Sequence, residues 1–489
     1  MSRHRRRGGK DAGYAGQASR TSSIVNLLNT IVGAGTLTMP FVLSRMGIML
    51  GVILVLWSGV TAAFGLYLQA RCARYLDRGT ASFFALSQIT YPNAAVIFDA
   101  AIAIKCFGVG VSYMIIIGDL MPGVMEGITS HASQFPYLLS RHFWITAFML
   151  LVIPLSFLRR LDSLKYTSIV ALVSIGYLIV LVVYHFAVDP HASPEDIRVI
   201  EWAGPIETLS TLPVVVFAYT CHQNMFSIVN EIKDNSPGNM VSVVGSSIGS
   251  AGVIYLLVAI TGYITFGNSV VGNIVMMYAT GIASTIGKAA IVILVLFSIP
   301  LQVHPCRASL DAVFKWRPNR SSQSTGARPG SPMLAPVAPR SDHSTAPMSD
   351  TRFALLTTLI LTLAYITALS VSSLDKVLAY VGSTGSTSIS FILPGLFYYK
   401  ISDPESSHHQ RLVKEDDDID EANSDVEDAG AVPQNGSQGG AWRWRKKWRW
   451  DLEHIDHLVI RKAALCLAIY GLGVMAVCLF MNVFFSAAH

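Results

Sequence analysis

The sequence predicts an all-α polytopic membrane protein with about eleven transmembrane helices. Of its 489 residues, 52% are hydrophobic and only 14% are charged, a balance more apolar than that of an ordinary soluble domain. Hydrophobic segments of roughly 18 to 25 residues recur along the chain, and each is long enough to cross the hydrocarbon core of a bilayer. Two of these segments contain polar interruptions, which predict helices that break inside the membrane.

The predicted spans follow one another along the chain. They lie at 24–44, 47–70, 96–121, 143–158, 166–188, 209–229, 241–266, 282–303, 352–371, 377–398 and 461–485. A polar, basic tail at 1–23 precedes them, is expected to be disordered, and lacks the apolar core of a cleaved signal peptide. Basic residues gather in this tail and in the even-numbered connections, so the positive-inside rule places the N-terminus in the cytosol. The odd number of spans then places the C-terminus on the far side of the membrane, which is the lumenal side if the membrane encloses an organelle.

The first span contains a polar interruption between Asn26 and Thr36. The two asparagines and two glycines of this run are poor material for a continuous membrane helix. In hydrocarbon, unpaired backbone N–H and C=O groups are tolerated only where they line a cavity or are buried in protein. A break at this depth therefore predicts a binding site for a small polar solute. The alternative for Gly33 and Gly35 is close helix packing through small residues.

The sixth span repeats this design, because an apolar segment meets the helix breaker Pro213 and then a polar run from Thr220 to Asn224. Interruptions five spans apart are typical of an inverted five-plus-five repeat, which places both breaks around one midplane site. The N-termini of the two half-helices would then offer free N–H groups and positive dipole ends to a carboxylate. His222 is interpreted either as a neutral histidine hydrogen-bonded inside the bundle or as a proton relay.

Three other spans carry polar side chains. Lys105 lies about nine residues into the third span, roughly 13 Å along a helix axis. A charge at this depth is costly and indicates a function, with snorkelling or a carboxylate partner as the alternative. In the eighth span, Ser298 offers a hydroxyl where a cation could sit with Asn29, provided that backbone carbonyls contribute. In the tenth span, the small hydroxylated residues Gly382–Ser390 allow close helix approach.

Two long inserts interrupt the series of spans. The residues at 316–350 are rich in Ser, Pro, Arg and Gly, which predicts a disordered cytosolic linker. The insert at 401–455 is first acidic and then carries the cluster Trp442–Trp450, in which four Trp are interleaved with five cations. This cluster predicts a juxtamembrane anchor on anionic cytosolic lipid. Nucleic-acid binding is not expected of nine residues tethered between two membrane spans.

No catalytic or metal-binding cluster is recognisable in the sequence. The chain lacks zinc-ligand spacing, a phosphate-cradling glycine loop and a nucleophile elbow, and its histidines and carboxylates are scattered. Its six cysteines lie within or at the edges of predicted spans, so no disulfide framework is expected. An enzyme, a metal site and an organic cofactor are therefore not expected. The expected partners are the lipid bilayer and a small-molecule ligand, and no feature identifies a protein partner.

Six segments of the chain resemble a known family of membrane proteins. They are Asn26–Pro40, Lys105–Tyr113, Leu161–Tyr166, Phe217–Glu231, Pro300–Arg307 and Val381–Gly395. In these segments the chain resembles the amino acid/auxin permease family, specifically its fungal vacuolar amino-acid transporter branch. It is also similar to the sodium-coupled neutral amino-acid transporters of animals. The resemblance covers nearly all of the membrane region and ends in the N-terminal tail and the two inserts.

The resemblance implies a LeuT-like fold, with a transporter core at 24–398 and one extra C-terminal helix at 461–485. It also implies the residues that bind the amino-acid backbone. These are Thr30, Ile31, Val32, Gly33, Ala34 and Gly35 in the first span and Phe217, Ala218, Tyr219 and Thr220 across from them. The sodium position of the animal branch corresponds to Asn29 and Ser298. The fungal branch resembles proton-coupled carriers, for which His222 and Lys105 are the intramembrane candidates.

The expected function is secondary active transport of neutral amino acids across the vacuolar membrane by alternating access. H+ is the expected coupling ion and Na+ the alternative, and export into the cytosol is the expected direction. Two other functions stay open at this point. One is amino-acid uptake by a permease of the plasma membrane, and the other is an amino-acid receptor that binds its ligand with little flux.

Overall fold

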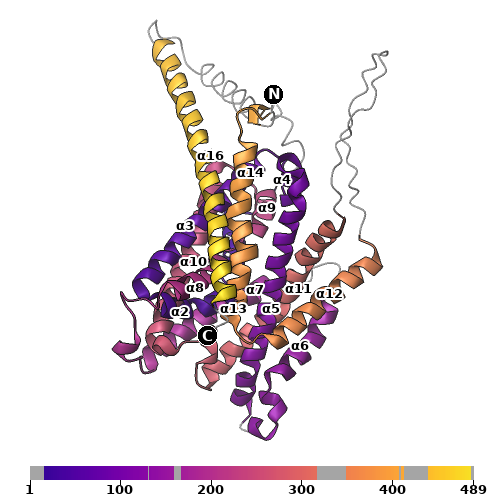
Figure 1. Cartoon of the computed structure of the whole chain (residues 1–489), viewed down its shortest axis with the longest axis vertical. Coiled ribbons are helices and arrows are strands. Elements are labelled where there is room, and N and C mark those ends of the chain that lie inside the picture. Colours follow the sequence, from indigo (N-terminus) through magenta and orange to yellow (C-terminus); the bar gives the residue numbers. More distant parts are fainter. Residues whose placement is uncertain are drawn as a thin grey trace, which may run out of the picture.

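The computed structural model describes residues 16–129, 131–158, 167–315, 348–406, 409–411 and 439–485, and this part of the chain is almost entirely helical (Figure 1). The α-helices are α1 (Arg20–Ile31), α2 (Ala34–Met46), α3 (Ile48–Ala73), α4 (Phe83–Thr90), α5 (Ala95–Ile128), α6 (Arg141–Ser156), α7 (Thr167–Val188), α8 (Pro205–Ala218), α9 (His222–Glu231), α10 (Pro237–Phe266), α11 (Ile282–Lys315), α12 (Asp350–Ser370), α13 (Leu374–Val381), α14 (Leu393–Ile401) and α16 (Gly439–Phe484). Two π-helical stretches, Gly382–Ser386 and Ser388–Ile392, join α13 to α14.

The helices confirm the all-α polytopic fold. In the described residues, eight helical segments are long and apolar enough to cross a membrane, and the pair of α1 and α2 adds a bent one. α6 is a shorter apolar helix of 16 residues. Every span predicted from the sequence overlaps at least one of the helices.

The first predicted span is broken as expected, and α1 and α2 are bent by 56° relative to each other. Val32 leaves the helical conformation with φ −79° and ψ 97°, although its N–H still bonds to the carbonyl of Leu28 at 2.9 Å. Gly33 follows with φ −148° and ψ −138° before α2 begins. The break therefore falls inside the run of asparagines and glycines that predicts it.

The predicted N-terminal tail, by contrast, ends earlier than residue 23. α1 begins before the expected start of the first span, because the side chain of Ser19 accepts a hydrogen bond from an N–H of its first turn and caps the helix. Ala18 also pairs with Ile232 in a β-bridge that joins the start of α1 to the end of α9. Residues 1–15, for which disorder is expected, lie outside the described residues.

The sixth and tenth predicted spans are interrupted as well. α8 and α9 form one apolar segment in which residues 219–221 leave the helix. In the tenth span, the π-helical stretches widen the helix between α13 and α14. Gly385 in this segment lies against α5, since a Cβ added to it would be 2.8 Å from the backbone nitrogen of Lys105. The close helix approach expected of the small residues in this span is therefore present.

α16 is much longer than the eleventh span that the sequence predicts. The helix begins at Gly439 rather than near residue 461, so the cluster Trp442–Trp450 belongs to the same helix as the span. The physical reason is that no Gly or Pro separates the cluster from the span, and nothing in between stops the helix. Most of the linker at 316–350 and of the acidic run in the insert at 401–455 lies outside the described residues.

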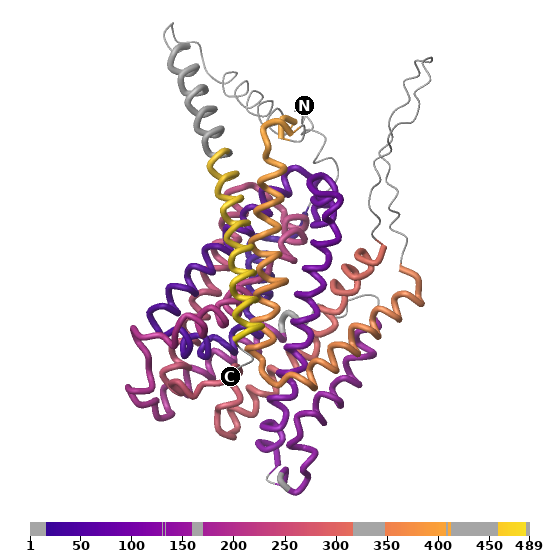
Figure 2. The backbone as a smooth tube through the Cα atoms, in the orientation of Figure 1, coloured from indigo at the N-terminus to yellow at the C-terminus, as the bar shows by residue number. Residues whose placement is uncertain are grey.

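The two broken spans lie in the interior of the bundle. α10 packs against α1, α2 and α3, and α11 packs along α5. On another side, the orange α14 contacts both the indigo α3 and the yellow α16 (Figure 2). The end of the bundle where α1 begins, with α4 and α9, lies toward the top of Figure 1 and is called the α1 end. The other end, where α2 meets α3, is called the opposite end.

Candidate functional site

A cavity of about 460 Å³ lies where the two helix breaks meet. Its size is within the range of small-molecule pockets, about 300 to 1,000 Å³. Helices far apart in the sequence contribute to its wall. The lining residues are Asn26, Asn29, Thr30, Ile31, Val32, Gly33, Ala34, Gly35, Phe83, Ile102, Lys105, Val109, Tyr113, Ala171, Ile175, Phe217, Ala218, Thr220, Gln223, Asn224, Ser227, Leu294, Val295, Ser298, Leu301, Gln302 and Pro305.

Most of the site residues expected from the sequence line this one cavity. They are Asn29, Thr30, Ile31, Val32, Gly33, Ala34, Gly35, Lys105, Phe217, Ala218, Thr220 and Ser298. The structure separates Tyr219 and His222 from them. The Tyr219 ring packs edge to face against Tyr255, with ring centroids 5.1 Å apart. His222 is fully buried behind the break, and its Nε2 lies 3.1 Å from the carbonyl oxygen of Ala62. The interpretation of His222 as a hydrogen-bonded histidine fits this position.

The N-terminus of α2 faces the cavity through Gly33, Ala34 and Gly35. The first N–H groups of a helix have no intrahelical acceptor and form the positive end of its dipole. In this turn, the N–H of Thr36 bonds to the carbonyl of Gly33 at 3.0 Å. The remaining N–H groups provide a site for a carboxylate, as helix N-termini commonly do.

The two glycines of the break have different surroundings. A Cβ added to Gly33 would have Tyr113 Oη, at 3.9 Å, as its nearest neighbour, so Gly33 borders open space in the cavity. A Cβ added to Gly35 would lie 2.7 Å from Cβ of Ala218, so Gly35 allows α2 and α8 to touch. The interpretation of an open binding site therefore fits Gly33, and that of small-residue packing fits Gly35.

Side chains at the second break link the two broken spans. The side-chain amide of Asn224 in α9 donates to Thr30 Oγ1 in α1 at 2.9 Å. Thr220 Oγ1 donates to the carbonyl of Val216 at 2.7 Å and lies 3.2 Å from Oγ of Ser390. The half-helices α1 and α9 are therefore connected directly across the cavity wall.

Two polar oxygens in the wall have no hydrogen-bond partner among the described residues. They are Oδ1 of Asn29 and Oε1 of Gln223, and both are buried. Ser298, which lines the same cavity, donates its hydroxyl to the carbonyl of Leu294 at 2.8 Å. Buried acceptors without donors are costly. The cavity wall is therefore suited to a ligand or a cation that brings its own donors or positive charge.

Lys105 is the one charged residue among the described residues of the cavity wall. Its side chain is 4% exposed, and it forms no hydrogen bond or ion pair with the rest of the described chain. A carboxylate partner, one of the alternatives open from the sequence, is not found there. A buried ammonium group without a counter-charge is costly in a membrane protein. The cavity therefore attracts an anionic group.

The cavity extends from the breaks toward the α1 end. Its walls include Asn26 near the start of α1, Ser227 in α9 and Pro305 in the second half of α11. We call the part of the bundle between the breaks and the α1 end the cavity half. The part between the breaks and the opposite end is called the closed half.

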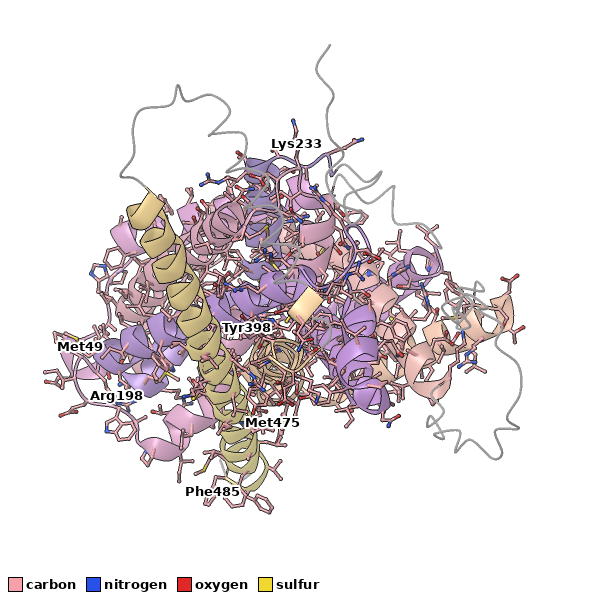
Figure 3. The ribbon with its side chains drawn as sticks, turned by 90° about the horizontal axis from the view of Figure 1, so that it is seen from above. Met49, Arg198, Lys233, Tyr398, Met475 and Phe485 are labelled. Carbon is pink, nitrogen blue, oxygen red and sulfur yellow. The ribbon has the colours of Figure 1, made fainter. Side chains whose placement is uncertain are left out.

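The closed half is covered by the loop at 189–204. The N–H groups of Ile48 and Met49 donate to the carbonyls of Arg198 and Val199, each at 3.0 Å. The Arg198 guanidinium donates to the carbonyl of Ser44 at 2.8 Å. Arg198 and Met49 lie on the same edge of the bundle in Figure 3. This loop thereby fastens the turn between α2 and α3.

Some residues of the wall are absent from the predicted site. Tyr113 lies in a segment that carries the family resemblance, and Gln223 and Asn224 lie in the polar run of the sixth span, so a signal for them exists in the sequence. Gln302 also lies in a resembling segment. Phe83 in α4 has no such signal, because α4 lies outside the predicted spans and reaches the cavity only through the tertiary fold.

Comparison with known proteins identifies relatives over most of the chain. The profile of a family described as "Transmembrane amino acid transporter protein" matches residues 16–417. The chain is 43% identical over 404 residues to Vacuolar amino acid transporter 5 of Schizosaccharomyces pombe, covering 82% of this chain and 89% of that protein. It is 42% identical over 411 residues to Vacuolar amino acid transporter 6 of Saccharomyces cerevisiae, covering 78% of this chain and 90% of that protein.

Two solved structures have a similar fold. MhsT in complex with L-phenylalanine matches with a TM-score of 0.54 and 13% identity, covering 95% of this chain and 100% of that chain. Mhp1 in its inward-facing conformation matches with a TM-score of 0.54 and 10% identity, covering 79% of this chain and 77% of that chain. At these identities the similarity concerns the fold alone, and it confirms the LeuT-like arrangement expected from the resemblance.

Proposed function

This chain belongs to the transmembrane amino acid transporter family, and on that premise we propose that it couples export of neutral amino acids to downhill proton movement. It is a multi-pass transporter of amino acids in the vacuolar membrane and not an enzyme. The proposal adds the coupling ion, the direction and the substrate class to this assignment. In the proposed orientation the α1 end faces the cytosol, the C-terminus faces the lumen, and the cavity half receives or releases substrate on the cytosolic side.

One observation carries the proposal, namely the cavity formed by the two helix breaks. The N-terminus of α2 offers N–H groups for the α-carboxylate of an amino acid. The last carbonyls of α1 and α8 belong to Ile31 and Ala218, which also line the cavity, and the C-terminal ends of helices favour a positive group such as the α-ammonium. The breaks thus provide complementary partners for both charges of a zwitterion.

The apolar part of the wall supports the neutral substrate class. Ile102 and Val109 in α5, Phe217 in α8, and Val295 and Leu301 in α11 line the cavity and offer no partner to a charged side chain. Lys105 is the feature that opposes this assignment, because it would also favour a second carboxylate on the substrate. A substrate panel that contains dicarboxylic amino acids therefore tests the proposal directly.

We assign the coupling proton to Lys105. The support is its position, since Lys105 faces the cavity whereas His222 lies behind the break against Ala62. Buried lysines act as general bases in other proteins, so a lysine at this position is able to carry a proton. The competing assignment is a sodium ion near Asn29 and Ser298, which both line the cavity. The same substrate would then be carried by alternating access, with Na+ in place of H+.

Flux measurements in proteoliposomes test the proposed function. The purified protein is reconstituted, and uptake of radiolabelled glutamine, leucine, aspartate and lysine is followed with and without a pH gradient, in sodium-free and in sodium-containing buffer. We expect saturable flux of the neutral amino acids that the pH gradient stimulates and sodium leaves unchanged. Preference for aspartate would contradict the substrate class, and dependence on sodium would contradict the coupling ion. Saturable binding without flux would support the receptor instead.

The proposed direction and orientation need separate measurements. A protease-sensitive tag at each terminus, probed in sealed vacuoles, reports which end faces the cytosol. Vacuoles preloaded with labelled amino acid and acidified by their proton pump should release the label faster when the transporter is present. Retention of the label, or accumulation against its gradient, would contradict export.

A further inference from the structure

Tyr255, in the middle of α10, lies directly behind the meeting point of the two broken spans. Its side chain is fully buried and is not part of the cavity wall. Its hydroxyl lies 2.7 Å from the carbonyl oxygen of Ile31 and 2.7 Å from the carbonyl oxygen of Ala218. Ile31 is the last residue of α1 and Ala218 is the last residue of α8. One hydroxyl thus bridges the two helix ends.

The chemistry of these ends explains why a donor is needed there. The last carbonyls of a helix have no intrahelical donor, and they form the negative end of its dipole. Two such ends that converge inside a membrane require a shared donor or a cation. The tyrosine hydroxyl carries a single proton, so the two carbonyls share it. Each carbonyl oxygen also has a second lone pair, and Ile31 and Ala218 both line the cavity.

We propose that Tyr255 is a positioning residue that holds the two breaks in register, so that the carbonyls of Ile31 and Ala218 meet the ammonium group of the substrate. The inference rests on the proposed function, because it concerns amino-acid binding in the same cavity. Tyr255 itself contacts no substrate. It acts from the side of the breaks that faces away from the cavity.

Packing on the other side of the same junction supports this role. Gly35 allows α2 to touch Ala218, so the start of α2 and the end of α8 are already held together by direct contact. That contact does not include the end of α1, where Thr30 is bonded to α9 through Asn224. The hydroxyl of Tyr255 joins the end of α1 to the end of α8 by bridging Ile31 and Ala218. The Tyr219 ring packs edge to face against Tyr255 and fixes the ring that carries the hydroxyl.

The substitution Tyr255→Phe tests the inference, because it removes the hydroxyl and keeps the ring. We expect the KM and the dissociation constant for a neutral amino acid to rise about tenfold, the size of effect that follows from buried acceptors left without a donor. The maximal rate should change by less than about threefold, since the helices that rock are unaltered. A rise in KM with little change in the maximal rate indicates a positioning role. A general loss of structure would instead lower the maximal rate and the amount of folded protein.

Tyr177→Phe is the matched control. The Tyr177 hydroxyl donates to the backbone carbonyl of Ala283 at 2.9 Å, which joins α7 to α11 away from both breaks. We expect its KM to stay within about twofold of the wild-type value. An unchanged KM in Tyr255→Phe would overturn the inference. An equal rise in both variants would overturn it as well, since KM would then respond to the loss of any such hydroxyl.

A second variant tests the same inference if Tyr255→Phe does not accumulate in folded form. A ring-fluorinated tyrosine introduced at position 255 keeps the ring and the donor but makes the hydroxyl more acidic. A KM shift of at least about twofold, absent when the same residue replaces Tyr177, would support the inference, and an unchanged KM would overturn it. Wild-type protein without saturable amino-acid binding would contradict the proposed function. Wild-type binding that both Tyr255 variants leave unchanged would contradict this inference alone.

Discussion

The cavity half and the closed half of the bundle differ in the size of the cavity that each contains and in the charged groups of its wall. The cavity half surrounds about 460 Å³ and contains a buried lysine and two buried side-chain oxygens without partners in the described chain. The closed half contains a cavity of only about 130 Å³, and an ion pair between Arg45 and Glu207 at 3.2 Å lies in its wall. Its loop at 189–204 bonds directly to the turn between α2 and α3.

The contacts that hold the closed half are hydrogen bonds and an ion pair between protein groups, and they form without a substrate. The cavity half leaves donors and acceptors for a substrate to satisfy. Each hydrogen bond of the loop contributes on the order of 1 kcal/mol, so a few of them can break and re-form during transport. In the proposed alternating-access cycle, the two halves exchange these properties.

The largest expected effect is the loss of transport in Gly33→Val. The added side chain would occupy the space that Gly33 borders in the cavity half, so we expect flux to fall at least about a hundredfold while the melting temperature stays near the wild-type value. Flux and thermal unfolding of the purified variant check both expectations. Preserved flux would remove Gly33 from the binding site.

Gly35→Ala is the matched comparison at the same break. Here the added methyl group would meet the backbone and Cβ of Ala218, so overpacking should lower the free energy of unfolding by about 1 to 3 kcal/mol. A stability equal to that of the wild type would show that the contact between α2 and α8 is looser than the structure indicates.

The next effect is expected for Lys105→Met. Removal of the ammonium group deprives the substrate carboxylate of a buried charge, so we expect the KM to rise about thirtyfold or more and stimulation by the pH gradient to disappear. Lys288→Met is the control, because Lys288 is a buried lysine whose Nζ donates to the carbonyl of Tyr278 at 3.0 Å outside the cavity. If the response to the pH gradient survives in Lys105→Met and is lost in Lys288→Met, the coupling proton belongs to Lys288 and not to Lys105.

A third prediction concerns the hydrogen bonds between the loop at 189–204 and the turn between α2 and α3 in the closed half. Arg198→Ala removes the bond from the guanidinium to Ser44, and a hydrogen bond from a charged donor is worth about 1.5 to 3 kcal/mol. We expect the ratio of molecules open at the opposite end to molecules open at the α1 end to rise about tenfold or more. Thiol labelling of Thr211→Cys, a buried position in the smaller cavity, should become faster.

Labelling of Ser227→Cys in the cavity half should become slower in the same variant, because the two halves open alternately in the proposed cycle. Both reporters require replacement of Cys466, the one exposed cysteine among the described residues. Faster labelling at both positions would indicate partial unfolding rather than a shift between two states.

The smallest effect is expected for Asn224→Ala. This change removes the hydrogen bond from α9 to Thr30 but leaves the backbone of both breaks intact, so we expect the KM to rise about two- to fivefold. Asn239→Ala provides the comparison, since the half-buried Asn239 side chain donates to the carbonyl of Asp234 and does not line the cavity. A larger effect in Asn239→Ala than in Asn224→Ala would show that the bridge between α1 and α9 is unimportant for binding.

Much of the architecture follows from local chemistry and was therefore predictable. Asparagines and glycines inside an apolar run predict the break between α1 and α2, because a backbone in hydrocarbon needs partners that such a run cannot supply alone. The polar run after Pro213 predicts the second break for the same reason. Hydrophobic length predicts the other spans. The depth of Lys105 along its span follows from the rise of a helix, and the structure places Lys105 in the cavity wall.

Tertiary structure decided which of the residues at the breaks meet. Thr220 lines the cavity whereas its neighbours Tyr219 and His222 turn away from it, because side-chain direction where a helix ends depends on the packing of other helices. Tyr255 has no signal in its apolar span, since its partners are backbone carbonyls 224 and 37 residues away. Hydrophobicity and local propensity are properties of short segments. Long-range contacts, which place Ile31, Ala218 and Tyr255 together, exist only in the folded bundle.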